Sequence, residues 1–259
     1  MTKFTPTVEQ LVSALRRSMQ SKDEVGAQRA VDELLTRAWE SIDREEDAPE
    51  GRRIAELMKE AGHPAGFEIS AVIFEQAGEI DKAIESVQAG LQLAPTVSRL
   101  WELLGNLHSD ADRHDQAQEA FDKALGCEHR NEPSIRYNKA LSAYRNQKFD
   151  PAAAELDKID EKAIDDDELL MHVQALRVST LNGLEKFKEA IVLAKKILEK
   201  YPEDTCPESC IPHLAEVHAQ LGRAILERDN DPAKALASAK NAIRCDQGNP
   251  LALDLVRAI

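Results

Sequence analysis

The chain of 259 residues has few aromatic side chains, few cysteines and no long apolar run. Aromatic residues make up 4% of the sequence, and four cysteines at this length are too sparse for a disulfide framework. Nowhere do about 18 apolar residues follow one another, and residues 1–10 contain no basic stretch followed by an apolar one. We therefore expect a cytoplasmic protein without a membrane span, whose cysteines are small buried residues.

Positive charge is also scarce. The chain has 33 Lys and Arg against 47 Asp and Glu, which gives a formal net charge of −14. A nucleic-acid surface needs a basic stripe to displace counterions from phosphates, and anionic membranes attract the same kind of surface. We therefore expect neither nucleic acid nor a membrane as partner, and the acidic charge favours basic or neutral proteins through steering.

The sequence is rich in residues that favour helices. Ala, Leu, Glu and Lys are abundant, 31% of the residues are charged, and β-branched runs are rare. At 42% apolar residues, the chain can bury a sizeable core. This composition predicts an all-α protein.

One segment, residues 101–124, has the most specific pattern. It predicts two amphipathic helices joined by a polar turn at residues 110–115. The residues that define the pattern are Trp101, Leu104, Gly105, His108, Ala117, Phe121 and Ala124. Gly105 and Ala117 stand where we expect two antiparallel helices to approach closely, because a bulky side chain there would force them apart.

This spacing resembles the tetratricopeptide repeat (TPR), a helical hairpin of about 34 residues with the pattern W-x2-L-G-x2-Y…A-x3-F…P. His108 stands in place of the tyrosine and His129 in place of the late proline. The resemblance implies an α-solenoid, in which antiparallel helix hairpins stack into a right-handed superhelix.

Counting along the chain from this hairpin predicts about five TPR-like repeats between helical caps. The predicted repeats are 64–97, 98–131, 133–166, 168–202 and 213–247. Residues 1–62 are predicted to be an N-terminal helical cap or a degenerate repeat, and residues 249–259 a C-terminal helix that covers the open end of the solenoid. The register of the first helix in the fourth repeat stays open. Val173, Leu176 and Thr180 fit one phase, and Gln174, Arg177 and Leu181 fit another.

The family resemblance also implies a function. TPR proteins are interaction scaffolds, and partner peptides or helices lie in a concave groove lined by the first helices. The groove residues that it implies here are Arg99, Glu102, Asn106, Tyr137, Asn138, Tyr144, Arg145 and Arg223. Asparagine amides can bond an extended backbone, tyrosines offer flat apolar area, and arginines can fork onto carboxylates.

A subtype of the family binds chaperone tails through a carboxylate clamp of lysine, asparagine and arginine. Asn106 and Asn138 fit two of its five places, but Glu102 replaces the first lysine. Without the cations, a bound carboxylate would lose its hydration with too little compensation. We therefore expect a non-catalytic adaptor that does not recognise a chaperone tail.

Two alternatives remain open. The N-terminal 62 residues have an apolar stripe without a repeat partner and could pack on a second copy of the chain, giving a homo-oligomer. The segment Cys206-x3-Cys210-x2-His213-x4-His218 could bind zinc or respond to redox conditions, although its spacing matches no common zinc finger. No phosphate-binding loop, nucleophile elbow or His-Glu-x2-His motif is present, so we expect no enzyme activity and no cofactor or resident metal.

Overall fold

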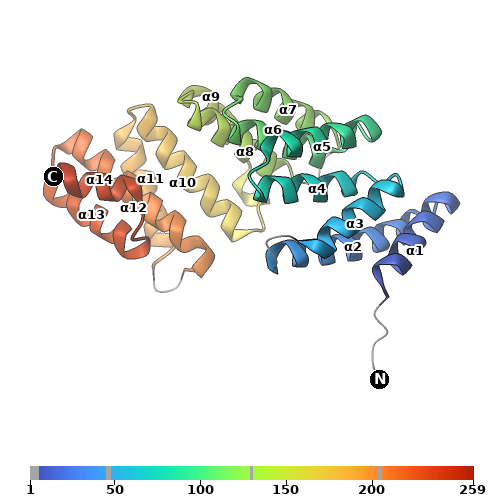
Figure 1. Ribbon diagram of the computed structural model, residues 1–259. Coiled ribbons are helices and arrows are strands. Elements are labelled where there is room, and N and C mark those ends of the chain that lie inside the picture. Colours follow the sequence, from blue (N-terminus) through green and yellow to red (C-terminus); the bar gives the residue numbers. More distant parts are fainter. Residues whose placement is uncertain (1–5, 45–47, 129–130, 204–205) are drawn as a thin grey trace. The chain divides into compact units, whose positions relative to one another are not determined.

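The computed structural model (Figure 1) describes residues 6–44, 48–128, 131–203 and 206–259. Within these residues it contains α-helices α1 to α14 and two short 3₁₀-helices, and no strand, so the predicted all-α class is confirmed. Among the described helices, not one combines the length and the apolar character that a transmembrane segment needs. The chain divides into two compact units, Met1–Arg130 and Asn131–Ile259.

Unit 1 is a row of helices, each packed against the next. They are α1 (Val8–Ser21), α2 (Glu24–Arg44), α3 (Pro49–Glu60), α4 (Ala65–Gln76), α5 (Ile80–Leu93), α6 (Ser98–Asp110) and α7 (His114–Gly126). In addition α2 contacts α4, and α4 contacts α6. Unit 1 is therefore a stack of hairpins in which alternate helices form a common layer, as in an α-solenoid.

Unit 2 repeats this arrangement. Its helices are α8 (Glu132–Arg145), α9 (Phe149–Leu156), α10 (Asp167–Gly183), α11 (Phe187–Lys200), α12 (Ile211–Asp229), α13 (Pro232–Cys245) and α14 (Pro250–Ala258), with 3₁₀-helices η1 (Glu161–Ala163) and η2 (Glu208–Cys210). Here α10 contacts both α8 and α12, and α12 contacts α14. Each predicted repeat contains two of the helices of its unit, while the exact repeat boundaries stay a prediction.

Four hairpins share one turn geometry. The second residue after the first helix has a left-handed backbone, at Gly78, Asp112, Gln147 and Glu185. The next N–H then donates to a carbonyl five residues earlier, for example from Arg113 to His108 at 2.8 Å and from Lys148 to Ala143 at 2.9 Å. This is the Schellman motif, which satisfies carbonyls that the helix end leaves unpaired. The recurring turn sets the antiparallel packing of each hairpin.

The predicted close contact at Gly105 involves a ring and not a second backbone. A Cβ added at Gly105 would lie 2.6 to 2.8 Å from three ring carbons of Phe121, whose side chain is fully buried. Unit 2 has a similar contact, because a Cβ at Gly183 would lie 2.5 Å from the nearest ring carbon of Phe149. In both units a glycine of a first helix makes room for a phenylalanine of a second helix.

The N-terminal stripe has partners within the chain. Val8, Leu11, Val12 and Leu15 of α1 belong to one buried cluster that also contains residues of α2, α3 and α4. The short segment after residue 48 is a full helix, α3, in which Ile54 and Met58 are completely buried. Most of the stripe is thus covered by the chain itself, while Met19 and Val25 are 41% and 72% exposed, and self-assembly stays a prediction.

Two irregular positions in unit 2 have a clear structural explanation. Lys139 replaces the expected leucine on α8, and its ammonium pairs with the buried carboxylate of Glu155 on α9 at 3.2 Å. On α10, Gln174 and Arg177 face α9 and η1, since they bond Glu161 and Asp157. The second of the two phases considered for the fourth repeat is therefore the one that the structure adopts.

Candidate partner-binding surfaces

In unit 2, two rows of side chains run across α8, α10 and α12. The first row is Tyr137, His172 and His213. The second lies seven residues further along each helix, at Tyr144, Ser179 and Gln220. In the first row, the Tyr137 and His172 rings stack with centroids 5.5 Å apart, and His172 meets His213 edge-on at 3.8 Å. Because seven residues make about two helical turns, both rows lie on one face of each helix, which we call the inner face.

A hydrogen-bonded network, which we call the polar seam, underlies the second row. Its members are Ser179, Asn182, Glu216, Gln220 and Asn249. The Gln220 amide donates to Glu216 Oε1 at 2.7 Å, and the Ser179 hydroxyl donates to the same oxygen at 3.3 Å. Asn182 Nδ2 donates to Gln220 Oε1 at 2.8 Å and to the Gln220 carbonyl at 2.9 Å. The seam therefore ties α10 to α12.

The seam also reaches the last helix. Asn249 Nδ2 donates to Glu216 Oε2 at 3.4 Å, while Asn249 Oδ1 accepts the N–H of Ala252 at 2.9 Å and so caps α14. Asn182, Gln220 and Asn249 are 1%, 3% and 4% exposed. Buried amides with hydrogen-bond partners fix one packing arrangement, so the seam fixes how α10 and the start of α14 pack on α12.

The rings of both rows are uncharged at pH 7. Burial raises the pKa of Tyr137, and it raises the pKa of Tyr144 together with the nearby Glu216 charge. Burial lowers the pKa of His172, and burial with the neighbouring His172 lowers the pKa of His213 to about 4. The inner face thus offers neutral aromatic surface and hydrogen-bonding groups.

Five of the predicted groove residues lie on α8 and α12, and whether they bind a partner stays a prediction. Tyr137, Asn138 and Tyr144 are half-buried on α8, and Arg145 at the end of the same helix is exposed. Arg223 is half-buried on α12, where its charge acts on Tyr144. His172, Ser179 and Asn182 were not predicted, because the sequence leaves the register of α10 open.

The other predicted groove residues lie in unit 1. Arg99, Glu102 and Asn106 all belong to α6. Arg99 Nε bonds Glu68 Oε1 of α4 at 2.9 Å, and Glu102 is only 8% exposed. Asn106 is half-buried. The predicted groove residues are therefore divided between two units.

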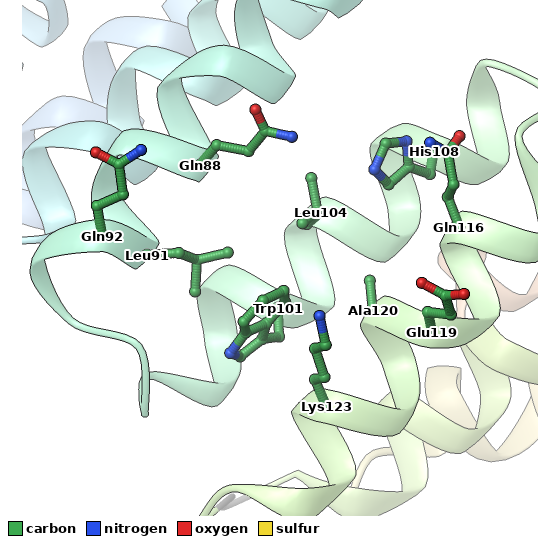
Figure 2. A pocket seen from close by; sticks show the side chains of 10 residues that line it. All are labelled: Gln88, Leu91, Gln92, Trp101, Leu104, His108, Gln116, Glu119, Ala120 and Lys123. Atoms are coloured by element: carbon green, nitrogen blue, oxygen red, sulfur yellow. The ribbon is translucent and has the colours of Figure 1, made fainter.

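Unit 1 has a further cleft that the sequence did not predict. It has a volume of about 470 Å³ and lies between α5, α6 and α7. Figure 2 shows Gln88 and Gln92 on the α5 side, and Glu119 and Lys123 on the α7 side. The Lys123 ammonium lies 4.5 Å from the centroid of the Trp101 ring, whose N–H donates to the Pro95 carbonyl at 2.8 Å.

The cysteine segment does not support the zinc or redox alternative. Within the described part of the chain, no group of three or more His, Cys, Asp or Glu could hold a metal ion. His213 instead packs against His172, and Cys210 is 1% exposed. Burial raises the pKa of the Cys206 thiol to about 11, so the reactive thiolate is scarce at pH 7.

Comparisons with known proteins agree with this fold. Residues 102–167 match the tetratricopeptide repeat family. Similar solved structures include YrrB, a TPR protein with an unusual peptide-binding site, at 18% identity and TM-score 0.56, covering 78% of this chain and 96% of that one. The type IV pilus biogenesis factor PilW gives 14% identity and TM-score 0.59, covering 98% of this chain and 100% of that one.

A tetratricopeptide repeat protein from Parabacteroides merdae gives 12% identity and TM-score 0.52, covering 96% of this chain and 97% of that one. A comparison with curated proteins found no match. At these identities the structural likeness concerns the fold, and the family match concerns the segment that carries the Trp101 hairpin. Together they show that the chain has the fold of tetratricopeptide repeat proteins and that residues 102–167 match the family itself.

Proposed function

We propose that this chain is a non-catalytic, cytoplasmic scaffold that captures a segment of a partner protein on the first-helix faces of its repeats. TPR proteins generally act as protein-interaction modules, which supports the general part of the proposal. The observation that carries the specific part is the inner face of unit 2. There α8, α10 and α12 present two aligned rows of aromatic and polar side chains.

The polar seam is what makes this face suited to binding. Association costs conformational entropy when interface side chains become ordered, and a surface that is already ordered avoids much of that cost. The buried Asn182 and Gln220 amides hold α10 against α12, so the half-buried Tyr137 and Tyr144 stand on a fixed base. Tyrosines in such settings commonly supply a large share of interface binding energy.

The charge of the chain indicates the kind of partner. With a net charge of −14, the protein attracts basic or neutral segments and repels acidic ones. Asn138 can both donate to and accept from a peptide backbone, and Arg223 can fork onto a carboxylate or carbonyl group. A short extended segment or a helix of a partner fits this chemistry.

The test uses the full chain immobilised in native cell extract, with captured proteins quantified by mass spectrometry. Asn138→Ala combined with Arg223→Ala should reduce capture of the specific partner about thirtyfold, because each loses a hydrogen-bonding group worth roughly 1 kcal/mol. Asn106→Ala tests the α6 face of unit 1 in the same way. The matched control is Lys195→Ala combined with Lys196→Ala, two exposed positions on α11.

Thermal midpoints of all variants are measured alongside, and they should stay close to that of the natural chain because the substituted side chains are not fully buried. Equal capture by the α8–α12 variant and by the α11 control would mean that the inner face of unit 2 is not the binding surface.

A further inference from the structure

Three clefts in this protein occupy equivalent places. Each lies between two successive second helices, and the first helix between them forms the floor. They are the α5–α6–α7 cleft of about 470 Å³, the α9–α10–α11 cleft of about 100 Å³ and the α11–α12–α13 cleft of about 660 Å³. Each lies within a single unit, and none includes a residue of the inner face.

In each of the two clefts of unit 2, an arginine side chain is bonded to acceptors of the chain itself. In the α9–α10–α11 cleft, Arg177 lines the floor, where it donates to Asp157 Oδ1 at 2.9 Å and to the Leu156 carbonyl. In the α11–α12–α13 cleft, the Arg244 guanidinium forks onto the Glu203 carboxylate. In the α5–α6–α7 cleft, Leu104 holds the place of Arg177, so no guanidinium fills the space.

The α5–α6–α7 cleft combines an apolar floor with an amide rim. Leu91, Leu104 and Ala120 at the floor are 7%, 6% and 3% exposed. Three exposed glutamines stand above them, Gln88 and Gln92 on α5 and Gln116 on α7 (Figure 2). A glutamine amide both donates and accepts, as a peptide group does.

This rim fits an extended segment better than a helix. The N–H and C=O groups of a helix bond within the helix, whereas those of an extended chain remain available to side-chain amides. The floor runs along α6 from Trp101 to His108, seven residues that span about 10 Å at roughly 1.5 Å per residue. An extended chain covers that length with about three residues.

A buried group at one end of the cleft lacks a partner. His108 is 6% exposed, and its Nδ1 has no hydrogen-bond partner within the described part of the chain. The His108 imidazole lines the cleft and points into it (Figure 2). Burial and the nearby Arg113 charge lower the pKa of His108, so the imidazole is neutral at pH 7. Because Nδ1 has almost no accessible surface, this end of the cleft offers a ligand the uncharged imidazole ring and not that nitrogen.

The charges at the rim cancel. Glu119 and Lys123 are the two charged residues that line the cleft, and the Lys123 ammonium rests on the Trp101 ring. On a chain with a net charge of −14, this neutral rim is suited to an uncharged segment.

We propose that the α5–α6–α7 cleft is a second peptide-binding site, which takes an uncharged, extended segment of a partner protein. A large aliphatic side chain of the segment lies on Leu91, Leu104 and Ala120. The flanking peptide groups bond the glutamine amides of the rim. The site shares no residue with the proposed inner face, so either site can fail without the other.

The experiment uses the full chain with Trp39→Phe, which leaves Trp101 as its single tryptophan. The probes are capped pentapeptides, acetyl-Gly-Ala-Xaa-Ala-Gly-amide, in which Xaa is leucine, lysine or glutamate. Binding is followed by the indole N–H resonance of Trp101 in two-dimensional NMR. The leucine peptide should produce a saturable shift at millimolar concentration, and the two charged peptides should bind at least about fivefold more weakly.

Two variations test the role of the backbone contacts. Gln88→Ala combined with Gln92→Ala should weaken binding of the leucine peptide about tenfold, and so should methylation of two of the peptide nitrogens. Gln76→Ala, at an exposed glutamine of α4, should leave binding unchanged. The proposal is overturned if the leucine peptide gives no saturable shift, if all three peptides bind equally, or if the Gln88 and Gln92 substitutions have no effect.

Discussion

Replacement of Gly105 by alanine tests how the hairpins of this protein are held together. In most exposed helical positions this change is favourable, because alanine forms helix more readily than glycine by about 1 kcal/mol. At Gly105, however, the new methyl group would lie 2.6 to 2.8 Å from three ring carbons of Phe121. Ordinary contact needs about 3.4 Å or more, so the ring must retreat by close to 1 Å.

The Phe121 ring has no free space to move into, because its side chain is 0% exposed within the packed α6–α7 hairpin. Forcing extra volume into a well-packed core costs about 1 to 3 kcal/mol. After the gain in helix propensity is subtracted, we expect Gly105→Ala to lower the free energy of unfolding by up to about 2 kcal/mol. For a chain of this size, that is a fall in thermal midpoint of up to about 8 °C.

The assay is urea and thermal unfolding followed by circular dichroism. Gly126→Ala is the matched control, since a Cβ at that helical position meets nothing within 4 Å. It should leave stability unchanged or raise it by up to about 1 kcal/mol. Combining Gly105→Ala with Phe121→Leu should cost less than the sum of the two single changes. A Gly105→Ala protein as stable as the Gly126→Ala protein would refute the packing account.

Three further changes probe unit 2. The pKa of His213 is lowered to about 4 in the folded state, so the stability that its neutral form contributes is present above the ordinary value of 6.5 and is lost as the pH falls toward 4. In unfolding measured from pH 7 to pH 4, His213→Asn should therefore reduce the acid-induced loss of stability by up to about 3 kcal/mol. Glu155 is 7% exposed and bonds Arg136, Lys139 and Lys158, so Glu155→Gln should lower the unfolding free energy by about 3 kcal/mol at pH 7; a loss under 1 kcal/mol would contradict this. Gln147 has a left-handed backbone with φ 56°, so Gln147→Gly should raise the thermal midpoint slightly, whereas Lys148→Gly should lower it.

The sequence contains enough information to predict the hairpin fold. Trp101, Leu104 and His108 lie at helical spacing on one segment, Ala117, Phe121 and Ala124 do so on the next, and such a pattern of large and small residues is compatible with few packings. The local turn conformations were less accessible. Gly78 indicates a left-handed backbone, but Asp112 and Gln147 adopt the same conformation without a glycine, because the flanking helices impose it.

The register of α10 could not be predicted for a physical reason. The helix packs against α8, α9, α11 and α12, and buried residues such as Met171, Val173 and Val178 lie all around it. A helix covered on several sides has no single apolar stripe, so periodicity does not reveal which residues face which neighbour. His172 and Ser179 were missed for this reason.

The polar seam and the α5–α6–α7 cleft were beyond the sequence for a different reason. Asn182 and Gln220 are residue types that usually lie on protein surfaces, and only the packing of α10 on α12 buries them together. The cleft depends on the space between α5 and α7. Leu104 lies at its floor, whereas Arg177 lies at the floor of the equivalent cleft in unit 2.

The most direct test of the proposed scaffold function is site-specific photocrosslinking in the native cell. The photoreactive residue p-benzoylphenylalanine is placed in the full chain at position 138 on α8, next to Tyr137 of the inner face, or at the exposed position 196 on α11. We expect position 138 to crosslink one defined segment of a partner protein, and the crosslink to disappear when Arg223 is replaced by alanine. Crosslinks of the same protein from position 196, with none from position 138, would contradict the proposal.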